Sequence, residues 1–182
     1  MLKCGLAGML FLKKSHLCKM NTDSTKMCQK LRKGNSISKA DMDVSNFDVF
    51  NDGTTLVIIN NGKENRFTER GIVDLYKIVK SNSDILRNAC VLDKAVGKAA
   101  AALMILGGAK QVNTPRISTP ALGLLKSANV EVNYRDEVPL ILNRMKSGSC
   151  PMESLCSESN DPEEIFRLID NFINNKKHGS NS

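Results

Sequence analysis

The sequence is poor in the residues that usually carry metal and aromatic chemistry. It has no tryptophan and, in 182 residues, only the histidines His16 and His178, both near the ends of the chain. We therefore expect no histidine catalysis and no histidine-rich metal site in the folded body. Six cysteines are present, but no two have the Cys-x-x-Cys spacing of paired zinc ligands or of thioredoxin-type motifs. We predict no metal site and, in a cytoplasmic chain, reduced thiols.

Long hydrophobic runs are missing as well. No stretch approaches the roughly 18 apolar residues that a membrane-spanning helix needs. Residues 5–12 form a short apolar run after Lys3, but Lys13 and Lys14 close it and no small-residue cleavage site follows, unlike in a signal peptide. We expect a cytoplasmic protein that does not contact the membrane.

Acidic residues are nearly absent from residues 1–40, which contain nine Lys or Arg and a single acidic residue, Asp23. The rest of the chain carries 17 basic and 18 acidic residues. A near-neutral body lacks the clustered cations that neutralise phosphates, so we expect no nucleic-acid partner for the folded domain. We interpret residues 1–45 as a basic, disordered extension, 46–176 as a single domain and 177–182 as a frayed C-terminus. Translation from Met20 or Met42 would remove most or all of that extension.

Patterns of strands and helices alternate along the body. Asn61-Gly62 between two strand patterns is typical of a hairpin with a type I′ turn. Residues 96–106 are apolar nearly all round, which indicates a helix buried in the middle of the domain. We expect strands at 55–60, 63–67, 89–92, 111–117 and 130–134, and helices at 68–82, 96–106, 119–129, 137–145, from Pro151 and over 161–175. This order predicts an α/β fold, a three-layer αβα sandwich with a mixed sheet and helices on both faces.

Two segments lie where a strand or loop leads into a helix, the place where open α/β sheets bind ligands. They are residues 93–98 and residues 150–153. Asp93 is placed to cap the helix that follows it, and Glu153, three residues after Cys150, fits a cap as well as an acid-base group. Cys150 is either a thiolate activated by the start of a helix or a small buried side chain.

Lys94, Gly97 and Lys98 stand near the start of the helix expected at 96–106. Free backbone N–H groups and two ammonium groups there predict a pocket for a phosphate or a carboxylate. The alternative is that Gly97 allows close helix packing while the lysines are only solvated. Asn143 and Arg144 either reach the edge of the same pocket or decorate the surface.

The motifs at residues 93–101, 118–122, 143–144 and 150–153, in this order, resemble the uncharacterised bacterial family known as domain of unknown function 1893. The resemblance covers about residues 50–175. It implies a fold similar to that of the cytidine deaminases, in a branch that lacks the usual zinc signature. Zinc deaminases need His or Cys with Ala-Glu at one helix start and Pro-Cys-x-x-Cys at the next.

Neither of the two helix starts has that zinc pattern. Residues 93–98 contain no His, Cys or Glu, and residues 150–153 offer one thiol in the reverse Cys-Pro order. The usual zinc-dependent deamination is therefore excluded unless Cys90 and Cys156 are recruited.

Three functions stay open. The first is a module that holds a small anionic ligand between Lys94, Lys98 and the Cys150 turn. The second is an enzyme, or a sulfur- or metal-handling protein, that uses Cys150 with Asp93 or Glu153 assisting. The third is a structural or partner-binding protein. Whether catalysis occurs, which cofactor is used, and the oligomeric state are not determined by these patterns.

Overall fold

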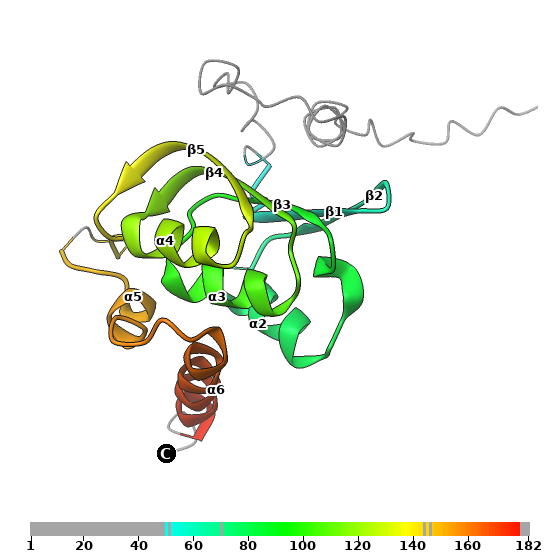
Figure 1. Ribbon diagram of the computed structural model, residues 1–182. Helices are drawn as coiled ribbons and strands as arrows, with labels where there is room; N and C mark the ends of the chain where they lie inside the picture. The colour runs from blue at the N-terminus through cyan, green and yellow to red at the C-terminus, as the bar shows by residue number, and fades with distance from the viewer. Residues whose placement is uncertain (1–49, 51, 70, 144, 146, 179–182) are drawn as a thin grey trace, which may run out of the picture.

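The fold is built around a five-stranded mixed sheet. A computed structural model describes residues 50, 52–69, 71–143, 145 and 147–178 (Figure 1). The strands are β1 (Leu56–Asn60), β2 (Lys63–Phe67), β3 (Cys90–Asp93), β4 (Gln111–Ser118) and β5 (Glu131–Val138), in the spatial order β2-β1-β3-β4-β5. β1 is antiparallel to both of its neighbours, whereas β3, β4 and β5 run parallel. The predicted α/β class and mixed sheet are confirmed.

The hairpin between β1 and β2 forms at the predicted place. Asn61 and Gly62 have φ angles of 49° and 79°. Positive φ at both central residues is what a two-residue type I′ turn requires, and Asn-Gly adopts it at low cost. Asn60 consequently pairs with Lys63 directly across the turn.

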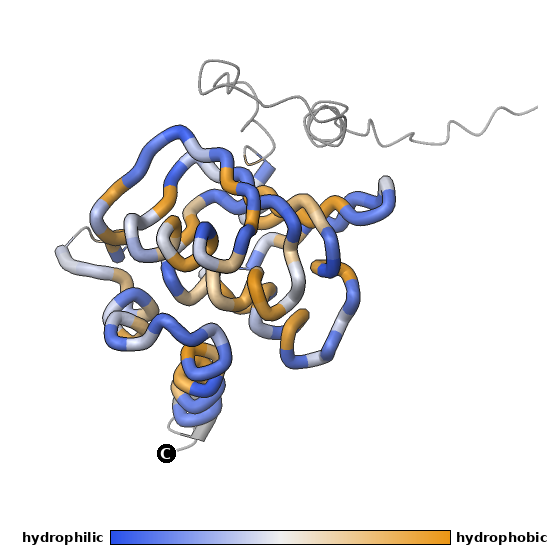
Figure 2. Tube along the Cα trace, viewed as in Figure 1, coloured by the Kyte–Doolittle hydropathy of each residue, from blue (hydrophilic) through white to orange (hydrophobic). Residues whose placement is uncertain are grey.

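The longer helices are α2 (Val73–Lys80), α3 (Lys98–Leu106), α4 (Thr119–Ser127) and α6 (Pro162–His178), together with the short α5 (Pro151–Leu155) and a 3-10 turn, η2 (Asp84–Leu86). α3 is the central helix, since α2, α4, α5 and α6 all contact it. Its residues from Lys98 to Met104 are buried, as the apolar sequence predicts. α6 has one apolar and one hydrophilic side (Figure 2), which suits a helix at the outside of the layer.

The hydrophobic core lies on one face of the sheet. Leu56, Ile58 and Val91 point to this face and join the apolar side chains of the helices in one cluster. Val57 and Leu92 are also buried but do not belong to that cluster, because alternate residues of a strand point to opposite faces. Within the described part of the chain, all helices lie on the core side (Figure 1), so the second helical layer of the predicted sandwich is not found there.

The predicted helix at 137–145 is wrong. Strand β5 continues to Val138, because Glu137 and Val138 pair with the last two residues of β4. Pro139 has no backbone N–H for a further ladder bond, and a loop follows up to Ser149. The apolar residues of this stretch include a helix-like spacing, yet Leu140 and Leu142 are exposed. Pairing with β4 overrides the local pattern.

The ends of the chain fall mostly outside the described residues. The extension expected at 1–45 lies outside them entirely, as do residues 179–182. The structure follows α6 as far as His178, within the stretch expected to fray.

Candidate functional site

The two segments singled out in the sequence lie against each other. Residues 93–98 connect β3 to α3, and residues 150–153 form the start of α5. The Glu153 carboxylate joins them, because its Oε2 accepts a hydrogen bond of 3.3 Å from the backbone N–H of Lys98. Its Oε1 accepts a second bond, at 3.4 Å, from the backbone N–H of Ile141. The site therefore lies at the end of β3, where its carboxyl edge meets α3, α5 and the loop after β5.

Glu153 occupies the position that was expected for a ligand anion. Its side chain is buried and sits at the first turn of α3, where backbone N–H groups lack partners within the helix. A negative charge is favourable there, because the N-terminal end of the helix dipole is positive. Gly97 makes the approach feasible, since a Cβ at this position would lie 2.8 Å from Glu153 Oε1. The N-terminus of α3 is thus capped by the protein's own carboxylate.

The two lysines of the expected pocket behave differently. Lys98 is buried, and its Nζ donates a hydrogen bond of 2.8 Å to the backbone oxygen of Ser157. This bond ties α3 to the turn that follows α5 and engages the ammonium group within the fold. Lys94, by contrast, is exposed and borders a wide cavity. The structure brings Lys94 and not the Lys98 ammonium to a surface where a ligand can bind.

That wide cavity, called the outer cavity below, has a volume of about 670 Å³. Three cations line it, Lys94 from the end of β3, Arg116 from β4 and Arg135 from β5. Arg135 also forms an ion pair of 3.1 Å with Asp136. The other lining residues are Thr55, Gly71, Asp93, Ala95 and Pro115.

Sequence reasoning missed both arginines of the outer cavity. Arg116 precedes the end of β4 by two residues, and the parallel register sets it opposite Asp136, the neighbour of Arg135. The carboxyl ends of parallel strands meet at one edge of a sheet. Two basic residues near the ends of neighbouring strands could therefore have indicated this site from the sequence.

A narrow second cavity, the inner cavity, has a volume of about 80 Å³. Its walls are mainly apolar, with Cys150 and the carboxylates Asp93 and Glu153 among them. It shares Gly71, Asp93 and Ala95 with the outer cavity, so the two hollows adjoin at Asp93. Its remaining lining residues are Ile72, Gly97, Lys98, Ala99, Ala100, Ile141 and Met152.

Asp93 does not cap α3, contrary to expectation. The chain bends at Lys94, Val96 then forms a bridge with Ile117, and α3 begins only at Lys98 with Gly97 at the N-cap. Asp93 Oδ1 instead accepts a hydrogen bond of 3.1 Å from the backbone N–H of Ala95. Burial raises the pKa of Asp93 to about 7, against the lowering effect of backbone hydrogen bonds from Ala95 and Lys94. Both protonation states of this carboxyl are therefore populated near neutral pH.

The two cysteines of this region differ in access. Cys150 is half-buried at the N-cap of α5 and lines the inner cavity. Cys156 is fully buried, and burial together with the nearby Glu153 charge raises the pKa of its thiol to about 11. Of these two thiols, Cys150 is the one that a solute in the inner cavity can meet.

Asn143 takes no part in either cavity. Its Oδ1 accepts a hydrogen bond from the backbone N–H of Ser147, at 3.1 Å, and its backbone N–H donates to the oxygen of Gly148. It closes the turn in the loop after β5. Arg144 lies outside the described residues.

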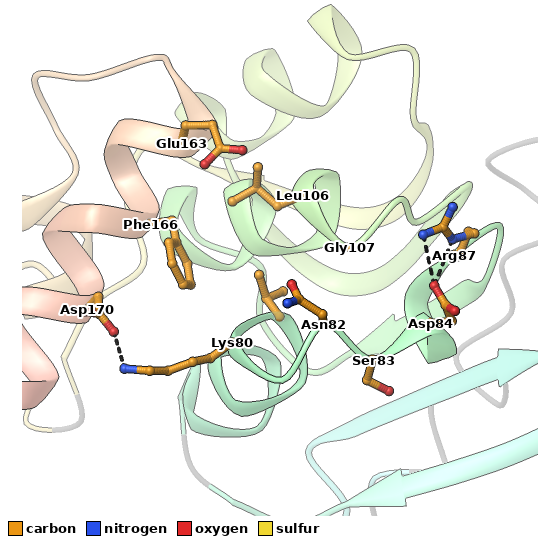
Figure 3. A pocket seen from close by; sticks show the side chains of 11 residues that line it. Lys80, Asn82, Ser83, Asp84, Arg87, Leu106, Gly107, Glu163, Phe166 and Asp170 are labelled. Carbon is orange, nitrogen blue, oxygen red and sulfur yellow. Dashed lines mark hydrogen bonds and ion pairs between the residues drawn. The ribbon is translucent and has the colours of Figure 1, made fainter.

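A third hollow, of about 420 Å³, opens between the ends of α2 and α3 and the side of α6 (Figure 3). Its cations are already engaged, since Lys80 points to Asp170 and Arg87 to Asp84. Glu163 adds a further negative charge. This hollow therefore offers an anion fewer unpaired cations than the outer cavity does.

Among the described residues there is neither a cluster of metal-binding side chains nor a membrane-spanning helix. No group of three or more His, Cys, Asp or Glu side chains is arranged there to hold a metal ion. No described helix has both the length and the apolar character needed to cross a membrane.

Comparison with known proteins gives a family without an assigned function. Residues 48–173 match the family described as domain of unknown function DUF1893, TM1506. The crystal structure of a DUF1893 family protein, TM1506 from Thermotoga maritima, is similar with a TM-score of 0.62 and 28% sequence identity, over 74% of this chain and 91% of that one. No curated protein matches. The chain therefore belongs to the DUF1893 family.

Proposed function

We propose that this protein binds a small anion in the outer cavity, on a domain of cytidine deaminase-like fold that does not carry out zinc-dependent deamination. One observation carries the proposal: Lys94, Arg116 and Arg135 converge on one cavity at the carboxyl edge of the parallel strands. Within the described residues, neither the Lys94 ammonium nor the Arg116 guanidinium has a hydrogen-bond or ion-pair partner. Phosphate or carboxylate oxygens are suitable partners for such groups.

The charge balance of the cavity supports a single small anion. Its lining residues include three cations and one carboxyl, Asp93, which is partly neutral near pH 7. A nucleic acid would need many cations spread over a surface, so we expect no binding of the folded domain to nucleic acid. The expected pocket between Lys94 and Lys98 is thus revised: Lys94 stays, Arg116 and Arg135 join it, and the Lys98 ammonium does not.

The deaminase-like fold and the loss of zinc chemistry remain parts of the proposal. The mixed sheet with its helices is compatible with such a fold, and so is the meeting of the α3 and α5 starts. The donors at that meeting are Glu153, Asp93 and Cys150. Zinc deaminases hold the metal with a His or Cys and two further thiolates, which this donor set does not match.

An enzyme based on Cys150 is the second candidate, because Cys150 and Asp93 line the same inner cavity. Titration of the thiol with a thiol reagent across pH, compared with the Cys150→Ser variant, tests this candidate. A thiolate that forms well below pH 8 would favour it, and a thiol that stays inert would count against it.

Isothermal titration calorimetry with inorganic phosphate and pyrophosphate tests the anion site directly. Lys94→Ala and Arg116→Ala should each weaken binding about 10- to 150-fold, since a hydrogen bond to a charged group contributes roughly 1.5–3 kcal/mol. Lys126→Ala is the matched control, because Lys126 is an exposed lysine of α4 that lines neither cavity. Equal affinities in all three variants and the natural protein would refute the proposal.

A further inference from the structure

We infer that the ligand is an organic anion with a short uncharged group, and that this group enters the inner cavity beside Cys150 while the charged group stays in the outer cavity. The inference rests on the proposed function and extends it to the chemical class of the ligand. It depends on how the two cavities differ and on how they adjoin.

The inner cavity does not suit a charged group. The Lys98 ammonium, which could attract an anion, is held by the oxygen of Ser157 at 2.8 Å. The Glu153 carboxylate in the wall is held by two backbone N–H groups and would repel a second anion. The surface that remains for a ligand is formed largely by Ile72, Ile141 and Met152.

The outer cavity has the opposite character. Its three cations, Lys94, Arg116 and Arg135, do not line the inner cavity. An anion is therefore drawn to the outer cavity, whereas an uncharged group is favoured within the inner one. Gly71, Asp93 and Ala95 line both cavities, so the two adjoin there, and Gly71 and Ala95 contribute little or no side chain at that place.

The volume of the inner cavity limits the uncharged group. A water molecule takes up about 30 Å³ in the liquid, so a cavity of about 80 Å³ admits a group of roughly two or three non-hydrogen atoms. Such a group would reach Cys150, the accessible thiol of this region, and shield it from solvent. A branched group would not fit without displacement of buried side chains.

Protection of Cys150 from alkylation tests the inference. The full chain is treated with iodoacetamide in the presence of inorganic phosphate, methyl phosphate, n-propyl phosphate or tert-butyl phosphate, and mass spectrometry of the Cys150 peptide follows the rate. At ten times its dissociation constant, n-propyl phosphate should slow the alkylation of Cys150 about tenfold, because only about one site in eleven is then free. Inorganic phosphate, although bound, should leave the rate nearly unchanged.

Affinities from calorimetry provide the second measurement. Each carbon that enters the inner cavity should tighten binding about fourfold, so n-propyl phosphate should bind more tightly than methyl phosphate. tert-Butyl phosphate should lose this advantage, because the cavity is too small for it. No substitution in the core is needed, so failure to fold does not confuse the result.

The outcomes separate the two proposals. If phosphate and n-propyl phosphate bind equally, depend on Lys94, and neither protects Cys150, the inference on the inner cavity is overturned while the anion site stands. If inorganic phosphate protects Cys150 as well as n-propyl phosphate does, the anion itself reaches the thiol and the inference is also overturned. If neither binds, or if Lys94→Ala changes nothing, both proposals fall.

Discussion

The Glu153 carboxylate caps helix α3 from another helix, accepting a hydrogen bond from the backbone N–H of Lys98 at 3.3 Å. Fifty-five residues of chain separate the two partners. Because Glu153 lies in the first turn of α5 and Lys98 begins α3, this bond couples the two halves of the candidate site. The carboxylate also stabilises the loop after β5 through Ile141.

Replacement of Glu153 should therefore destabilise the fold. Glu153→Ala removes the partner of the buried Lys98 N–H and of the partly buried Ile141 N–H, and each lost bond of this kind costs about 1–3 kcal/mol. Glu153→Gln should cost less, because its amide oxygen still accepts. Urea unfolding measures both, with Glu158→Ala, an exposed residue just beyond α5, as the control. Equal midpoints for Glu153→Ala and Glu158→Ala would contradict the capping role.

Alanine at two glycines should act with opposite signs. Gly97→Ala places a Cβ 2.8 Å from Glu153 Oε1 and 3.2 Å from its Cδ, so the carboxylate must leave its position. We expect a loss of about 1–3 kcal/mol, comparable to the loss of the cap. Gly123→Ala in α4 meets nothing within 4 Å and should stabilise the protein by about 0.5–1 kcal/mol.

A double-mutant cycle identifies the cause of the Gly97→Ala effect. If the collision with Glu153 is the cause, Gly97→Ala and Glu153→Ala should destabilise less together than the sum of the two single changes. Strict additivity would show that Gly97 matters for a different reason.

Asp93 should make stability fall as the pH rises. Its pKa is raised from 3.8 to about 7 by burial, so the folded state holds a proton that the unfolded state releases. The resulting stabilisation is complete below pH 3.8 and disappears as the pH rises to about 7, a total of up to about 4 kcal/mol. Asp93→Asn, whose amide oxygen can still accept from Ala95, should be more stable than the natural protein at pH 8 and nearly equal to it at pH 4. Urea unfolding at both pH values measures this, and parallel pH profiles would exclude a titrating Asp93.

The same group should make anion binding depend on pH. Sulfate is the appropriate probe, because its own charge is constant from pH 6 to pH 8. Glu153 and the Lys98 ammonium face the same region but are held in hydrogen bonds within the fold. Sulfate should bind more tightly at pH 6, where Asp93 is largely neutral, than at pH 8. Calorimetry on Asp93→Asn should show this difference abolished, and a difference that persists would assign the pH dependence to another group.

Local sequence patterns were sufficient for most of the secondary structure. The Asn61-Gly62 pair determines its turn through its own φ preferences, and the apolar composition of residues 98–104 requires burial wherever the helix packs. Residues 137–145 show the limit of this reasoning. Val138, Ile141, Leu142 and Met145 have a helix-like spacing. Glu137 and Val138 nevertheless pair with β4 as the end of strand β5.

The candidate site could be predicted only in part. Asp93, Lys94, Cys150 and Glu153 were recognisable because each stands near the start of a helix, and the structure brings them to the walls of two adjoining cavities. Asn143 turned out to close a loop, and Lys98 to bind the oxygen of Ser157. Arg116 and Arg135 were missed, because their joint position depends on the register of two parallel strands.

The sequence by itself determined the α/β class, the hairpin, the buried central helix and the family of this protein, because these depend on local preferences and on motifs read in order. The tertiary structure alone decided which charges a ligand can meet. Whether a lysine points to a cavity or to a backbone oxygen, and whether a helix end is free or capped by Glu153, depends on contacts between residues far apart in the chain. Those contacts are set by packing, which local pattern does not encode.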